Sequence, residues 1–101
     1  MDVTLLYIDE CPSWALAEGR LRRALDLLGY AETPITHVLV TSDEHARALD
    51  FRGCPTVLLD GVDPFSSIAP ARAGLTCREY PGHSGPAGAP TLDQLVAAIG
   101  R

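Results

Sequence analysis

Apolar residues in the first third of the chain follow the spacing of a buried strand and then that of an amphipathic helix. Residues 3–8 are apolar at nearly every position, which predicts a buried strand. Between residues 12 and 28, apolar side chains recur every three or four positions, which predicts a helix with one face in the core. Gly29 suits the position just past its end. The apolar stripe consists of Trp14, Ala17, Leu21, Leu25 and Leu28.

The next segments continue this alternation of strand and helix. Residues 35–40 predict a second strand. Thr41, with Glu44 three residues later, has the spacing of a capping box and predicts the start of a short helix. A strand, a helix and a strand joined by short links form a right-handed βαβ unit, so we expect the two strands to be parallel.

The second half of the chain predicts two further strands. A strand is expected from Thr56, because apolar residues follow it and the turn signal Asp60-Gly61 ends the run. Residues 75–80 alternate well enough for a fourth strand, with Leu75 and Cys77 on one face. Residues 62–74 are long for a structureless connection, so we expect them to pack against the body or near the site.

The chain is expected to end with a loop and a helix. Residues 81–90 are rich in glycine and proline, which predicts a loop. Thr91 and Gln94 form a second capping-box pattern, and the apolar positions that follow have helical spacing. The predicted fold class is therefore α/β, with the order βαβ-α-ββα, a four-stranded mixed sheet and helices on both faces. The strands from Val3 and Thr56 should be central.

The composition describes one folded domain, residues 1–101. The apolar fraction of 47% argues against disorder, and no apolar run approaches the length of a membrane span. No signal-peptide pattern is visible, so we expect a cytoplasmic protein with no membrane partner. The net charge of −5 argues against nucleic acid as a partner. Three cysteines, an odd number, do not form a closed disulfide framework.

Cys11 is the strongest candidate for chemistry. It stands where a predicted strand ends and a predicted helix begins. Free N–H groups and the positive end of the helix macrodipole stabilise a thiolate at such a position, and the thiolate is the nucleophilic form of cysteine. Pro12 fits the first helical position, where its missing N–H costs nothing.

Two motifs, Cys11-Pro12-Ser13-Trp14 and Gly53-Cys54-Pro55-Thr56, together with the order of the elements, resemble the thioredoxin-like superfamily over nearly the whole chain. The resemblance implies that Cys11 is the attacking thiolate. It also implies that Pro55 is a cis-proline that faces Cys11 across the site, since cis peptide bonds are nearly confined to proline.

This chain departs from the redox pattern of that superfamily, Cys-Xaa-Xaa-Cys, because Trp14 occupies the fourth position. In a thioredoxin-like fold the residue before the cis-proline lies beside the attacking cysteine. The resemblance therefore implies that Cys54 acts as the resolving thiol and forms a disulfide with Cys11, provided that their Cα atoms lie within about 7 Å. Pro12, Ser13, Trp14 and Thr56 are then expected to line the substrate groove.

The chain is also similar to small actinobacterial-type proteins that share a Cys-Pro start, a Phe-Xaa-Gly-Xaa-Pro-Thr centre and a Gly-Leu-Xaa-Cys-Arg-Xaa-Tyr stretch. Here the Cys-Pro start is Cys11-Pro12, and the second and third motifs lie at residues 51–56 and 74–80. Such proteins are labelled thioredoxin-like or alkylmercury lyase. An organomercurial lyase needs thiols and an acid, and nothing in the sequence singles out Asp9 or Glu10 for that role.

The remaining candidate residues favour structural interpretations. We expect Cys77 to be a core residue in a strand and Arg78 to be a surface charge on an edge strand. The three histidines lack metal-ligand spacing from a cysteine, so neither a metal site nor a cofactor is predicted.

The sequence favours a thiol-disulfide redox protein whose partner is a thiol or disulfide protein or a small-molecule thiol. Two alternatives stay open: a thiol-based module that binds a soft metal or an organomercurial, and an interaction domain without chemistry. The edge strand expected at residues 75–80 also offers a surface for pairing with a second copy of the chain.

Overall fold

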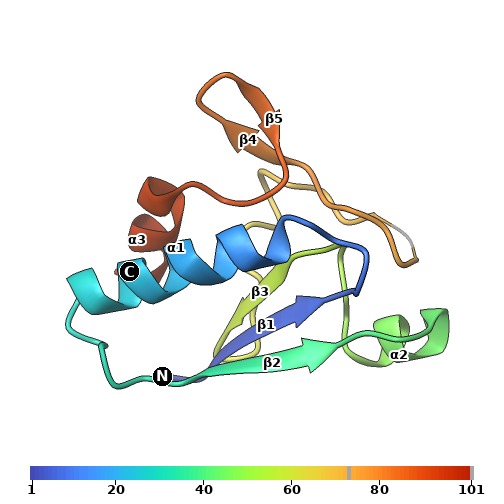
Figure 1. The fold of residues 1–101 in the computed structure, drawn as a ribbon, viewed down its shortest axis with the longest axis horizontal. Coiled ribbons are helices and arrows are strands. Elements are labelled where there is room, and N and C mark those ends of the chain that lie inside the picture. The colour runs from blue at the N-terminus through green and yellow to red at the C-terminus, as the bar shows by residue number, and fades with distance from the viewer. Residues whose placement is uncertain (73, 101) are drawn as a thin grey trace.

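Strand β1 (Val3–Tyr7) lies at the centre of a three-stranded mixed sheet in the computed structural model, which describes residues 1–72 and 74–100. It pairs in parallel with β2 (Ile35–Leu39) and antiparallel with β3 (Thr56–Leu59), so the strand order is β2-β1-β3 (Figure 1). The parallel βαβ unit predicted from the sequence is confirmed. The central place of the first strand is confirmed too, whereas β3 lies at an edge.

Helices pack on both faces of this sheet. Helix α1 (Trp14–Leu27) and helix α3 (Leu92–Ile99) contact each other and cover one face (Figure 1). Their buried side chains form one apolar cluster with Leu5 of β1. Successive strand residues point to opposite faces, so Leu6 belongs to a second cluster, which includes Ala46 of the short helix α2 (Asp43–Ala48).

The ends of the helices follow local sequence signals. Thr91 and Gln94 form the predicted capping box at the start of α3. At the end of α1, Gly29 has a φ of +87° and the N–H of Tyr30 donates to the carbonyl of Leu25, the bond of a Schellman motif. Helix α2 is capped by the side chain of Ser42 and not by the expected Thr41, because Ser42 accepts the N–H of His45.

The predicted fourth strand does not form among the described residues. Residues 75–79 make only an isolated parallel bridge between Cys54 and Cys77. The alternation in this stretch was assigned to the wrong register: Arg78 and Tyr80 are buried, whereas Leu75 and Cys77 are exposed. A shift of one residue turns every side chain to the opposite face, so the expectations of a core Cys77 and a surface Arg78 were both wrong.

The glycine- and proline-rich region contains a hairpin where a loop was expected. Strands β4 (Tyr80–Gly82) and β5 (Gly85–Ala87) pair antiparallel and form a separate two-stranded sheet (Figure 1). Of the segment expected to pack against the body, residues 62–74, the described part does so, because Phe65 and Ala69 are buried in the cluster beneath α1. No helix in the described parts of the chain is long and apolar enough to cross a membrane.

The buried stripe of α1 should contribute much of the stability. Leu21 is fully buried and Leu16, on the same helix, is 50% exposed. We expect Leu21→Ala to lower the free energy of unfolding by about 2–5 kcal/mol, because it removes buried apolar contacts and leaves a cavity. Leu16→Ala should change it by no more than about 0.5 kcal/mol. Urea unfolding followed by circular dichroism measures both, and equal effects would contradict the assigned face.

Candidate redox site

The topology brings Cys11 and Cys54 to the same end of the sheet. Cys11 follows the C-terminal end of β1, and Cys54 precedes the N-terminal end of β3. Because the two strands are antiparallel, with Leu6 paired to Thr56, the end of one meets the start of the other. The structure joins the two cysteines in a disulfide with a Cα–Cα distance of 6.3 Å, inside the range that disulfides span.

The disulfide lies inside the protein. The exposed fraction is 1% for Cys11 and 0% for Cys54. Both belong to the apolar cluster on the α2 face of the sheet, together with Ile8 and Phe51. Neither residue therefore presents appreciable surface to a thiol in solution in this conformation.

Cys11 is held in a turn before α1, and not at its first residue. Its N–H donates to the carbonyl of Ile8 at 3.3 Å. The helix begins at Trp14 with Ser13 as the N-cap, so the expectation that Pro12 is the first helical residue was wrong. The turn formed by Pro12 and Ser13 separates the cysteine from the regular helix.

Trp14 lies between the two apolar clusters. It is partly buried and packs against both. Its ring stacks on that of Tyr7 with centroids 4.6 Å apart, and the ring of His37 meets it edge-on at 6.3 Å. The Nε2 atom of His37 is 2.9 Å from a carboxylate oxygen of Glu18. The side chain in the fourth motif position thus links α1 to β1 and β2.

Pro55 and Thr56 are buried beneath the surface, unlike the exposed Pro12. The Cys54–Pro55 peptide bond is cis, as the resemblance implied. The hydroxyl of Thr56 donates to the carbonyl of Gly53 at 2.5 Å and accepts the N–H of Arg52 at 3.1 Å. Thr56 therefore closes the turn that carries Cys54. Of the residues expected to line a groove, only Pro12, Ser13 and Trp14 retain exposed surface.

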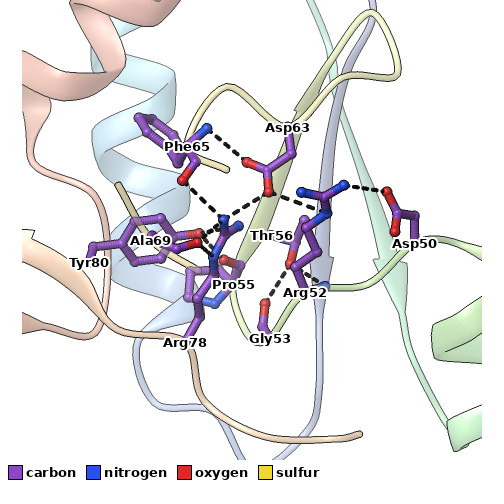
Figure 2. Close-up of polar contacts among 10 residues, drawn as sticks. All are labelled: Asp50, Arg52, Gly53, Pro55, Thr56, Asp63, Phe65, Ala69, Arg78 and Tyr80. Atoms are coloured by element: carbon purple, nitrogen blue, oxygen red, sulfur yellow. Dashed lines mark hydrogen bonds and ion pairs between the residues drawn. The ribbon is translucent and has the colours of Figure 1, made fainter. Parts of the chain in front are cut away.

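A buried ion pair lies behind this turn. The guanidinium of Arg78 is fully buried and its Nη2 atom is 2.8 Å from the Oδ2 atom of Asp63 (Figure 2). Its Nε–H donates to the carbonyl of Ala69 at 3.0 Å, and Nη2 donates to that of Phe65 at 3.3 Å. The other carboxylate oxygen of Asp63 accepts the N–H of Phe65 at 2.9 Å. The Arg78 guanidinium is thus paired and hydrogen-bonded, and the Oδ2 atom of Asp63 is held by ion pairs with Arg78 and, at 3.8 Å, with Arg52.

Tyr80 connects the ion pair to the proline. The Nη1 atom of Arg78 donates to the Tyr80 hydroxyl at 3.3 Å, and the hydroxyl donates to the carbonyl of Pro55 (Figure 2). Burial raises the pKa of the Tyr80 hydroxyl well above its usual value, despite the opposing effect of Arg78. The hydroxyl therefore keeps its proton and acts as the donor to Pro55.

The position before Cys54 has room only for glycine. Gly53 has a φ of +110°, which disfavours other residues. A Cβ atom added to it would lie 2.8 Å from the Cβ of Arg78. The backbone at Cys54 is fixed on the same side, because its N–H donates to the carbonyl of Thr76 at 2.8 Å and its carbonyl accepts the N–H of Arg78 at 3.0 Å.

A pocket of about 300 Å³ opens beside the turn that carries Cys11. Asp9, Glu10 and Leu75 contribute to its walls. The described residues contain no cluster of three histidine, cysteine or acidic side chains that could hold a metal ion. The strongest chemical feature of this region is therefore the pair of cysteines.

A scan against protein-family models found no match, and searches of curated proteins and of solved structures found none either.

We expect Arg78 to contribute more to the free energy of unfolding than an exposed arginine does. We expect Arg78→Met to lower the free energy of unfolding by about 3–5 kcal/mol, because it leaves the Asp63 carboxylate buried without its main partner. Arg72→Met, which removes an exposed pair with Glu79, should cost no more than about 1 kcal/mol. Urea unfolding measures both variants.

A double variant separates the ion pair from the packing. Arg78→Met combined with Asp63→Leu removes both buried charges and should recover part of the stability lost in Arg78→Met. If the double variant is less stable than Arg78→Met by the full additive amount, the two side chains do not interact as described.

Proposed function

We propose that the protein is a thiol-disulfide redox protein of the thioredoxin-like type, with Cys11 as the nucleophile and Cys54 as the resolving thiol. The observation that carries the proposal is the approach of Cys11 and Cys54 across the end of the sheet, although they are 43 positions apart in sequence. The two motifs come from separate elements, so their meeting depends on the fold and not on local sequence.

The arrangement supports a thioredoxin-like assignment beyond the coarse α/β class. A βαβ unit with a parallel pair precedes an antiparallel β3, the first cysteine follows β1, and a cis-proline precedes β3. The departures are the three-stranded sheet and the tryptophan in place of the second motif cysteine. Cys54, supplied from the other side of the site, takes over the role of that missing thiol.

The proposed reaction is the reduction of a disulfide. The Cys11 thiolate attacks one sulfur of a substrate disulfide, forms a mixed disulfide and releases the other half as a thiolate. The Cys54 thiolate then attacks the Cys11 sulfur, which releases the second half of the substrate and leaves the Cys11–Cys54 disulfide. Two electrons pass from the dithiol to the substrate. A thiol or dithiol reductant restores the protein by the reverse exchange.

The site includes features that suit this chemistry. The pocket beside the Cys11 turn offers a place for a substrate; its walls include Asp9 and Glu10 of that turn, and not Cys11 itself, which is 1% exposed. The hydrogen bonds that fix the Cys54 backbone hold the resolving thiol in place between turnovers. We propose a cytoplasmic thiol or disulfide compound, protein or small molecule, as the partner. The metal-binding and interaction-domain alternatives lack a specific supporting observation and become outcomes of the test.

Peptide mapping after mild oxidation tests the pairing. Every basic residue other than histidine is arginine, so trypsin places the three cysteines on separate peptides: 1–20, 53–72 and 73–78. We expect wild type treated with oxidised glutathione to show a crosslink between the first two peptides that a dithiol removes.

Cys11→Ser and Cys54→Ser should each abolish this crosslink and the reduction of a model disulfide. An unbridged Cys11 in wild type, with no disulfide reduction, would overturn the proposed function. Stoichiometric binding of a mercurial that needs both cysteines, without redox turnover, would favour the metal-binding alternative.

A further inference from the structure

The third cysteine lies next to the proposed redox pair. Cys77 is exposed and free, whereas Cys11 and Cys54 are buried. Cys77 is also the residue paired with Cys54 in an isolated parallel bridge. Cys54 is thus bonded to the buried Cys11 and is also the bridge partner of the exposed Cys77.

The backbone geometry brings Cys54 and Cys77 within disulfide range. Hydrogen bonds of 2.8 and 3.0 Å tie Cys54 to the residues on either side of Cys77. Bridge-paired residues lie about 4.8 Å apart, within the Cα separations of about 4.4–6.8 Å that disulfides span. Paired residues direct their side chains to the same face, and neighbours in sequence alternate. Arg78 points into the buried ion-pair network, so Cys77 points the opposite way, toward the face that holds Cys54.

We propose that Cys77 relays reducing equivalents to the buried disulfide by thiol-disulfide exchange. The Cys77 thiolate attacks the Cys54 sulfur, a Cys54–Cys77 bond forms, the Cys11–Cys54 bond breaks, and the electron pair leaves on the Cys11 thiolate. No electron is gained or lost in this step. The inference rests on the proposed function, and it assigns the site at which the external reductant acts.

The second stage uses two molecules of an external thiol. The first attacks the exposed Cys77 sulfur, forms a mixed disulfide with it and releases the Cys54 thiolate. The second attacks the sulfur of the first, restores the Cys77 thiol and leaves as the oxidised external disulfide. Two thiols thereby supply the two electrons that convert Cys11 and Cys54 to a dithiol. The relay gives the Cys11–Cys54 disulfide a route of exchange with thiols in solution, although Cys11 is only 1% exposed and Cys54 0%.

The kinetic test compares oxidised wild type with oxidised Cys77→Ser, both in the full chain. Because Cys77 is exposed, the variant should keep the unfolding midpoint of wild type. We expect glutathione to reduce the Cys11–Cys54 disulfide of the native variant about tenfold more slowly or worse, since the exposed thiol is gone. In a denaturant, which opens both proteins, the two rates should be equal. Equal rates in the native state would overturn the relay.

A trapping experiment detects the intermediate itself. In Cys11→Ser, and in Cys11→Ala should the serine variant fail to fold, mild oxidation with oxidised glutathione should link peptides 53–72 and 73–78. Cys54 and Cys77 that remain free thiols in a folded variant would overturn the relay. Neither result tests the proposed function, which is tested by the Cys11–Cys54 bond of wild type and by its reduction of a disulfide.

Discussion

The guanidinium of Arg78 is fully buried, and residues from the second half of the chain supply its ion-pair and hydrogen-bond partners. A buried charge is costly unless it is paired and hydrogen-bonded, and here Asp63 and the carbonyls of Phe65 and Ala69 surround it. The same requirement draws in Tyr80, whose hydroxyl reaches Pro55. The ion pair thereby fixes the loop that presents Cys54, although it lies on the opposite side of the turn from the disulfide.

Cys54 is the point where the elements of the site meet. The antiparallel pairing of β1 and β3 sets its distance from Cys11, and backbone hydrogen bonds set its place beside Cys77. Because both cysteines are buried, the proposed exchange needs a route from the surface to the disulfide. The relay proposed for Cys77 would supply that route, because Cys77 is exposed and is the bridge partner of Cys54. In this account, Cys54 lies between the buried Cys11, to which it is bonded, and the exposed Cys77, at which an external thiol would act.

The sequence predicted those parts of the fold that depend on local signals. The stripe of α1, the Thr91 capping box and the parallel βαβ unit follow from spacing alone. The pairing of Cys11 with Cys54 came from resemblance, because contacts between distant segments leave no local pattern. Arg78 was misplaced for the same reason: its ion-pair partner Asp63 and the carbonyls of Phe65 and Ala69 lie 9 to 15 residues away and make its burial favourable. Because the predicted register of this stretch was off by one residue, the expectation that Cys77 is a core residue was wrong as well.

The reduction potential of the Cys11–Cys54 pair tests the account most directly. The full chain would be equilibrated in glutathione buffers of graded ratio, alkylated, and scored by mass for the fraction of disulfide. We predict a single two-electron transition above about −300 mV, because a redox protein must exchange with a thiol pool. A disulfide that stays intact in the native protein at every ratio would mark a structural crosslink and contradict the account.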